Sequence, residues 1–239
     1  MTEPTRVYLH PVGLDGGTWT FLDTGVLDGA VTYTMLWHGG RPEPSEPLSM
    51  QTMAADVLDH VPGTLDLVGF SMGGAVALAA AIAAPDRVRS ILVGCASAGG
   101  GDGAVQHQRA LAAEELGMSG VVDDHLGRWF TPAALEPPAH PGVTCARDRL
   151  LGASAESFAA AWRALAANDA IHRLSSIRAG TTILHAAGDV STDLESKRKT
   201  ASMIRGARLR VIDGPHMAQL ENPSEVSQAI SEHLEWVRG

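Results

Sequence analysis

The sequence has few of the features that mark secreted or membrane-spanning proteins. It holds two cysteines in 239 residues, Cys95 and Cys145. Because Cys95 ends an apolar run typical of a buried strand, a disulfide framework is not expected. No stretch approaches the roughly 18 consecutive apolar residues of a transmembrane helix, and the first residues contain no apolar leader. We therefore expect a cytoplasmic protein.

Clusters of lysine and arginine are also missing. The formal net charge is −9, from 18 basic and 27 acidic residues, so nucleic acid and anionic membranes are poor partners. A small molecule is the expected partner, and the sequence makes no prediction of the oligomeric state. Hydrophobic residues make up 45% of the chain and charged residues 19%, a balance typical of a folded domain rather than a disordered chain.

Short apolar runs alternate along the chain with longer amphipathic or alanine-rich segments. The runs are rich in leucine and β-branched residues and are bounded by glycine, proline or polar residues, as strands are. Expected strands cover residues 7–9, 31–37, 65–69, 90–94, 182–185 and 207–212, and expected helices cover 48–60, 72–84, 192–205 and 223–237. This alternation predicts an α/β fold, with a mainly parallel six-stranded sheet covered by helices on both faces.

The alternation stops between residues 120 and 177, where no strand pattern occurs. This stretch contains an apolar segment, a proline-rich loop and an alanine-rich helix over residues 154–167. Long excursions from a compact core are often lids. We therefore expect a small helical cap at residues 120–177, inserted into a core formed by residues 1–119 and 178–239.

A Gly-x-Ser-x-Gly pattern at residues 69–73 follows an expected strand and opens an expected helix. In that setting Ser71 would occupy a sharp, strained turn, and the flanking glycines would avoid collisions with neighbouring elements. Ser71 would also lie at the start of a helix, where free backbone N–H groups favour negative charge. The pattern predicts that Ser71 is a nucleophile. The alternative is a glycine-rich turn with an incidental serine.

A serine hydroxyl needs a base to take its proton and a carboxylate to orient that base. His216 lies in the loop between the last expected strand and the last expected helix, and its position makes it the predicted base. Asp189 follows the fifth expected strand, and the order serine, acid, histidine makes it the predicted acid. Asp193 is the competing carboxylate. It is expected in the first turn of the next helix, where the helix dipole stabilises a negative charge, and this accounts for an aspartate there without a catalytic role.

The loop after the first expected strand, residues 10–19, is rich in glycine and is the expected partner of the nucleophile in an oxyanion hole. One donor would be the backbone N–H of Met72. The second would be the N–H of Val12, because Pro11 has no N–H to give. A cis peptide bond between His10 and Pro11 is an open alternative here, and so is a plain strand–helix loop without a catalytic role.

With these motifs the chain resembles the α/β-hydrolase superfamily, and more narrowly the 3-oxoadipate enol-lactonases and related small carboxylesterases. The broader resemblance rests on residues 69–74, 85–88, 188–189, 216 and 221–223, and the narrower one on 13–19, 128–132 and 156–169. The resemblance implies a Ser-His-Asp hydrolase that needs no metal or organic cofactor. The leading β-hairpin of the family is missing, which leaves six strands, and His10–Pro11 replaces small polar residues of the lactonase pattern.

The same resemblance implies a substrate pocket between the loop after the first strand and the cap. His10 would border the substrate, Trp129 and Phe130 would form an apolar wall, and Arg128 is a candidate to bind an anionic substrate. We expect hydrolysis of a small ester or lactone through an acyl-enzyme, with an enol-lactonase-like activity included. Open alternatives are perhydrolase, acyltransferase, hydroxynitrile lyase or cofactor-free oxygenase chemistry on this fold, and a non-catalytic ligand-binding protein.

Overall fold

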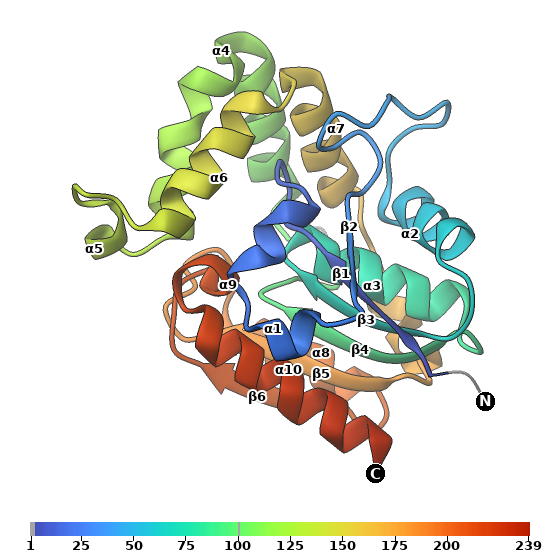
Figure 1. Ribbon diagram of the computed structural model, residues 1–239. Coiled ribbons are helices and arrows are strands. Elements are labelled where there is room, and N and C mark those ends of the chain that lie inside the picture. Colours follow the sequence, from blue (N-terminus) through green and yellow to red (C-terminus); the bar gives the residue numbers. More distant parts are fainter. Residues whose placement is uncertain (1–2, 100) are drawn as a thin grey trace.

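The computed structural model describes residues 3–99 and 101–239, and these contain a six-stranded sheet (Figure 1). In the order β2-β1-β3-β4-β5-β6, every neighbouring pair of strands is parallel. The strands are β1 (Thr5–Leu9), β2 (Val31–Tyr33), β3 (Leu65–Phe70), β4 (Val88–Gly94), β5 (Gly180–Ala186) and β6 (Arg208–Ile212). The predicted α/β fold and its parallel six-stranded sheet are thus confirmed.

Successive side chains of a strand point to opposite faces of the sheet. In a parallel sheet covered by helices on both faces, both sets of side chains are buried and mainly apolar. In β1, Val7 and Leu9 join the core cluster that includes α2 (Met50–His60) and α3 (Met72–Ala83). Tyr8 joins a second cluster with residues of α10 (Pro223–Arg238), which lies beside the short α1 (Thr24–Leu27) on the near side of the sheet in Figure 1. Helix α8 (Leu194–Met203) packs on β5 and β6. Helices therefore cover both faces, as expected.

The second strand is shorter than the sequence predicts. A strand was expected over residues 31–37, but β2 ends at Tyr33. Met35 is buried, and its N–H donates a hydrogen bond to the ring of His10 instead of to a neighbouring strand. Trp37 has a φ of 58°, which lies outside the β region. The apolar residues after Tyr33 that suggested a longer strand therefore lie in a loop, in which Met35 is buried and Leu36 and Trp37 are half-buried.

Four helices between β4 and β5 form a layer above the sheet in Figure 1, and we call them the cap helices. They are α4 (Gly103–Trp129), α5 (Pro132–Leu135), α6 (Pro141–Gly152) and α7 (Ala155–Ala166), and the 3-10 helix η2 (Ile171–Ser176) leads from them to β5. Helix α4 starts well before residue 120 and kinks at Gly117, where φ is 69°. The expected boundary therefore falls inside one helix, and the division into core and cap stays a prediction.

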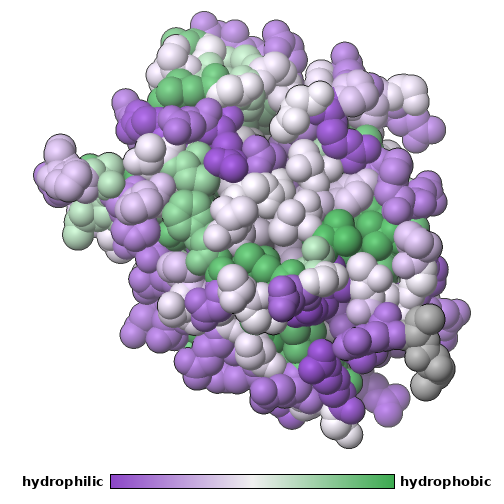
Figure 2. Space-filling model, in the orientation of Figure 1, coloured by the Kyte–Doolittle hydropathy of each residue, from purple (hydrophilic) through white to green (hydrophobic). Residues whose placement is uncertain are grey.

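A helix that spans a membrane must be both long and apolar along its length. Within residues 3–99 and 101–239, no helix is both long and apolar enough to cross a membrane. On the face seen in Figure 2, hydrophobic residues form separate groups among hydrophilic ones. The large hydrophobic side chains that are exposed include Leu111 and Leu116 on α4 and Val190 in the loop after β5. Single exposed residues of this kind are ordinary on a globular protein.

Helix α3 approaches strands β1 and β3 very closely at its first turn, and three glycines allow this. A Cβ on Gly69 would lie 2.2 Å from the carbonyl oxygen of Gly73, and a Cβ on Gly73 would lie 2.0 Å from that of Leu9. A Cβ on Gly74 would lie 2.6 Å from the Cβ of Ala96. Because two of these neighbours are backbone atoms, they cannot rotate away as a side chain could. The glycines therefore fix the place where β3 passes into α3.

Substitution of Gly73 by alanine tests this packing. We expect Gly73→Ala to lower the free energy of unfolding by at least about 2 kcal/mol, because the added methyl meets the backbone of β1. Gly127→Ala on α4 is the matched control: no atom lies within 4 Å of its added Cβ, and alanine favours a helix by about 1 kcal/mol over glycine. Urea unfolding of the two variants and the parent would measure both effects. Equal stability of the two variants would contradict the close approach.

Candidate active site

Ser71 lies in the turn between β3 and α3, at the carboxyl edge of the sheet. Its φ is 53° and its ψ is −118°, a strained conformation for a residue with a side chain. Its N–H donates to the carbonyl oxygen of Gly94 at 2.8 Å, which holds the turn against the end of β4. The half-buried side chain lines a cavity under the cap helices. The sharp turn expected at this serine is therefore present.

His216 lies between β6 and the short helix α9 (Ala218–Glu221) and connects Ser71 to Asp189. Its Nε2 is 3.1 Å from Oγ of Ser71, and its Nδ1 is 2.9 Å from Oδ1 of Asp189. Because an ionised carboxylate can only accept, Nδ1–H donates to Asp189. Nε2 is then free to accept the hydroxyl proton of Ser71. This arrangement is able to make the serine nucleophilic.

The carboxylate of Asp189 is buried after β5 and accepts several hydrogen bonds. Its Oδ1 accepts from the N–H groups of Ser191 at 2.7 Å and Thr192 at 3.2 Å, and the Thr192 hydroxyl donates to Oδ2. Burial alone would raise the pKa of this carboxyl. The charge and hydrogen bond of His216, with the donors of Thr192 and Ser191, outweigh burial and lower the pKa to about 2. Asp189 is therefore ionised at neutral pH.

The competing carboxylate, Asp193, bonds to the start of a helix and not to His216. It is the N-cap of α8, where its Oδ1 accepts from the N–H of Ser196 at 2.7 Å. Side chains of this type satisfy the free donors at helix starts. The structure thus brings Asp189, and not Asp193, to His216.

Cys95, Asp189 and His216 are the one grouping of described residues whose potential metal-binding atoms all lie within 4.8 Å of one another. Burial, with the charge of Asp189 second, raises the pKa of the Cys95 thiol, whereas a metal binds the thiolate. Nδ1 of His216 is already bonded to Asp189. The donor chemistry therefore does not suit a metal, and the absence of a metal cofactor stays a prediction.

The loop after β1 passes beside the first turn of α3. A Cβ on Gly73 would lie 2.9 Å from the carbonyl oxygen of His10. Among the described residues, neither the N–H of Val12 nor that of Met72 has a hydrogen-bond acceptor. An oxyanion hole needs two such donors beside the nucleophile. Met72 directly follows Ser71 in the chain, and the role of both N–H groups in an oxyanion hole stays a prediction. The peptide bond between His10 and Pro11 is trans.

His10 is built into the loop. The ring is fully buried, its Nδ1–H donates to the carbonyl of Pro11 at 2.8 Å, and its Nε2 accepts from the N–H of Met35 at 3.0 Å. Burial, with nearby His38 second, lowers the pKa of His10 well below its usual value. The neutral ring therefore braces the loop against the chain after β2, and its predicted contact with a substrate stays a prediction.

The loop that carries His216 is also tied to the cap helices. The N–H of Met217 donates to the carbonyl of Trp129, the last residue of α4, at 3.0 Å. The N–H of Thr131 donates to Glu221 at 3.0 Å, and its hydroxyl donates to the same carboxylate. These bonds hold the end of α4 against the segment just after His216.

Comparison with known proteins agrees with this geometry. The sequence profile described as "Alpha/beta hydrolase family" matches residues 7–229, which is nearly the whole chain. The chain belongs to the alpha/beta hydrolase family. It is 26% identical to 3-oxoadipate enol-lactonase 2 of Acinetobacter baylyi over 204 residues, covering 84% of this chain and 76% of that protein.

Other relatives of this alpha/beta hydrolase carry different names. It is 27% identical to the pimeloyl-[acyl-carrier protein] methyl ester esterase of Aromatoleum aromaticum, covering 97% of this chain and 98% of that protein. The solved enol-lactonase of Burkholderia xenovorans LB400 superposes with a TM-score of 0.91 at 24% identity, covering 98% of this chain and 92% of that chain. At that identity the likeness shows the shared fold alone.

A cavity of about 70 Å³ opens onto Ser71 and His216 in this alpha/beta hydrolase, and its walls come from the loop after β4, from α4 and from α7. Trp129 lies in the wall, as expected. Phe130 and Arg128 do not line it. Phe130 is buried, and Arg128 faces a different groove, where it pairs with Asp124 on the same helix. Their roles in substrate binding therefore stay predictions.

Sequence reasoning missed several side chains that line this cavity, among them Gln106, Arg109 and Trp162. The first two lie on α4 in a part that was assigned to the core, and no local pattern indicates which side of that helix faces Ser71. Thr192 was also missed, although a signal for it existed. It follows Asp189 by three residues, the spacing at which a hydroxyl and an N–H can bond back to a carboxylate.

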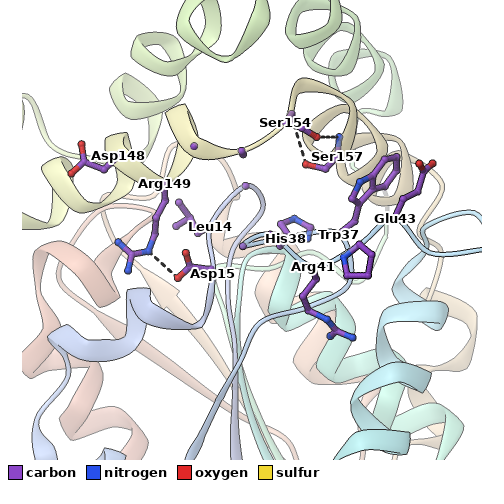
Figure 3. Close-up of a pocket in the computed structure, with 16 residues that line it drawn as sticks. Leu14, Asp15, Trp37, His38, Arg41, Glu43, Asp148, Arg149, Ser154 and Ser157 are labelled. Carbon is purple, nitrogen blue, oxygen red and sulfur yellow. Dashed lines mark hydrogen bonds and ion pairs between the residues drawn. The ribbon is translucent and has the colours of Figure 1, made fainter.

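A larger pocket of about 600 Å³ lies between the loop after β1, the chain after β2 and helices α6 and α7 (Figure 3). Leu14, His38 and Ser154 are among its lining residues, but Ser71 and His216 are not. At its edge, Arg149 of α6 bonds to Asp15 at 2.9 Å, as the dashed line in Figure 3 marks. This pocket is larger than the cavity at Ser71. Ser71 and His216 line only the smaller of the two, which is therefore the candidate active site.

The pH dependence of stability tests the ionised state of Asp189. Its pKa is lowered from 3.8 to about 2 in the folded protein, so the unfolded chain binds the proton first. The stability that this carboxylate contributes is present above about pH 4 and is lost as the pH falls toward 2. The loss amounts to about 2 kcal/mol.

Chemical unfolding of the parent and of Asp189→Asn at pH 5 and pH 2 would measure this contribution. We expect the parent to lose about 2 kcal/mol more than Asp189→Asn between these pH values, because asparagine does not titrate. Identical pH profiles for the two proteins would show that the carboxylate is not held ionised by its neighbours.

Proposed function

We propose that this protein is a serine hydrolase that cleaves a small carboxylic ester or lactone through an acyl-enzyme. The observation that carries the proposal is the unbroken hydrogen-bond chain from Asp189 through His216 to Ser71, with distances of 2.9 Å and 3.1 Å. Both distances lie within the range at which a base activates a nucleophile and is itself oriented by an acid.

In the first step, Ser71 Oγ attacks the carbonyl carbon of the ester while Nε2 of His216 takes the hydroxyl proton. The positive charge that forms on the imidazole is stabilised by the ionised Asp189. The carbonyl oxygen becomes negative and is bound by the N–H groups of Val12 and Met72, which have no other acceptor among the described residues. The strained turn at Ser71 holds the hydroxyl in place for this attack.

The first step ends when His216 gives its proton to the leaving oxygen, the bond between that oxygen and the acyl carbon breaks, and the acyl-enzyme forms. A water molecule then attacks the acyl carbon while His216 takes its proton. His216 returns that proton to Ser71 Oγ as the bond between Oγ and the acyl carbon breaks and the acid is released. For a lactone, the leaving hydroxyl stays tethered to the acyl group, so the product is a single hydroxy acid. The chain's own residues supply every proton transfer in the sequence.

The size of the site and the named relatives support the proposed substrate class. A cavity of about 70 Å³ at Ser71 suits a small acyl group better than a long chain. The named relatives act on an enol-lactone and on a methyl ester. Both reactions use the same attack on an acyl carbon, which supports ester or lactone hydrolysis as the shared chemistry.

Replacement of the serine is the direct test. We expect Ser71→Ala to lower kcat on 4-nitrophenyl acetate by roughly 10⁴-fold or more, because the acyl-enzyme cannot form. The variant should keep the parent's unfolding transition. Ser176→Ala, at an exposed serine in η2 whose hydroxyl bonds only to the carbonyl of Arg173, is the control and should keep full activity.

Covalent labelling separates this proposal from its alternatives. A fluorophosphonate should modify the parent at Ser71 and leave Ser71→Ala unmodified, as peptide mass spectrometry would show. If the parent is not labelled and hydrolyses neither esters nor lactones, a ligand-binding protein is the better interpretation. Labelling without hydrolysis would instead favour another reaction of the same triad, such as acyl transfer to an acceptor other than water.

A further inference from the structure

Arg109 occupies a special place in the cavity at Ser71. Of the described residues that line this cavity, it alone carries a permanent charge. It lies on the part of α4 before the kink at Gly117, and its side chain is half-buried. A cation that shares a small cavity with the nucleophile is in a position to contact whatever is bound to that nucleophile.

The charge of Arg109 has no ion-pair partner among the described residues, although the nearby carboxylate of Asp124, which lines a neighbouring groove with it, favours the charge. The other arginines of the cap helices all form ion pairs within the described structure: Arg128, Arg147, Arg149 and Arg163. Among the residues that the structure describes, no carboxylate pairs with Arg109 and no acceptor takes a hydrogen bond from it. Burial, with the nearby charge of Arg128 second, lowers the pKa of Arg109, although an arginine stays protonated at any physiological pH.

The guanidinium is also held in place. Its central carbon lies 4.7 Å from the ring centroid of Trp162, and the same tryptophan lines the cavity. Stacking of this kind orients the flat face of the guanidinium against the ring and leaves its N–H groups free at the edge. The arginine is therefore preorganised to bind an anion instead of being mobile in solvent.

The cavity widens outward into a polar mouth. A second pocket of about 340 Å³ shares Ser97, Gln106, Arg109, Ser191 and Thr192 with the inner cavity. Asp102 and Asp193 also line this outer part, but neither of them lines the inner cavity.

The two carboxylates of the mouth accept hydrogen bonds from the starts of helices. Each accepts backbone N–H groups at the start of a helix, Asp102 at α4 and Asp193 at α8. A substrate that extends from Ser71 into this mouth therefore meets hydroxyl, amide and guanidinium groups together with these two carboxylates. Such a lining suits a polar tail that ends at Arg109 and disfavours an aliphatic one.

From this arrangement we infer that Arg109 binds a carboxylate on the acyl part of the substrate, so that the preferred substrates are esters with a second, free carboxylate. The inference rests on the proposed function and names its substrate class. A carboxylate offers two oxygens in a plane, which match the paired N–H groups of a guanidinium. One carboxylate would also supply the ion-pair partner that Arg109 lacks among the described residues. A phosphate dianion would leave an excess negative charge in a protein whose net charge is already −9.

A pair of esters of nearly equal size tests the inference. Mono-4-nitrophenyl succinate carries a carboxylate where 4-nitrophenyl butyrate carries a methyl group. We expect the parent to show the higher kcat/KM on the succinate ester. Arg109→Gln should lower kcat/KM on that ester by about 10- to 100-fold, mainly through KM, and should change kcat/KM on the butyrate ester by less than about threefold. Arg109→Lys should give an intermediate value, because it keeps the charge and loses the two-pronged contact.

Arg163→Gln is the matched control, since it removes one arginine charge from α7 next to Trp162 but outside the cavity. Arg163 pairs with Glu114 at the surface, and its loss should leave the ratio between the two esters unchanged. Thermal unfolding of each variant would check that the cap helices remain folded. Equal losses on both esters in Arg109→Gln, or no loss on either, would overturn the role of Arg109.

Calorimetric binding of succinate separates failure of this inference from failure of the proposed function, because it needs no turnover. Succinate should bind the parent and bind Arg109→Gln at least about tenfold more weakly. If neither ester is hydrolysed and Ser71 is not labelled, this difference still supports an anion site at Arg109 while the hydrolase proposal fails. No difference between the two proteins, or tighter binding of inorganic phosphate than of succinate, would overturn the carboxylate site.

Discussion

The hydrogen bond between the buried carboxylate of Asp189 and the ring of His216 is the interaction on which the rest of the site depends. A buried charge is costly unless it is paired and hydrogen-bonded, and this one is satisfied by His216, Ser191 and Thr192 together. The sheet sets the geometry of the pair. Strands β5 and β6 are in register up to Ala186 and Ile212, and the pairing continues beyond them through the N–H of Gly188 and the carbonyl of Gly214, at 2.9 Å.

Much of this arrangement could be predicted from the sequence because it depends on local patterns. The Gly-x-Ser-x-Gly pattern needs only the two elements that flank it, and Asp189 and His216 each follow a strand that is recognisable by its apolar residues. Parallel strands bring their carboxyl ends to one edge of a sheet, so three loops far apart in the sequence could be expected to meet. The fold and the place of these three residues therefore follow from short-range signals combined with one rule of topology.

The cap helices were much less predictable. Arg109 and Trp162 meet only because α4 and α7 pack together, and the hydrophobic pattern of each helix does not specify the angle at which they cross. Arg128 was the more conspicuous arginine in the sequence, next to two aromatic residues, yet its side chain pairs with Asp124 along its own helix. His10 appeared free to meet a substrate, but both of its ring nitrogens bond to backbone. Such choices depend on tertiary packing, which a single sequence does not encode in any short pattern.

The backbone bond between Met217 and Trp129 has a consequence for how this protein can change over time. Helix α4 carries the unpaired arginine near its start, and at its end it supports the chain just after His216. New cap helices, acquired by recombination or installed by engineering, would need a backbone carbonyl at the position of that of Trp129. Without it, the segment just after His216 would lose one of the hydrogen bonds that hold it. Under the proposed function, substrate preference and the alignment of the proton-transfer groups would be inherited together, through a single helix.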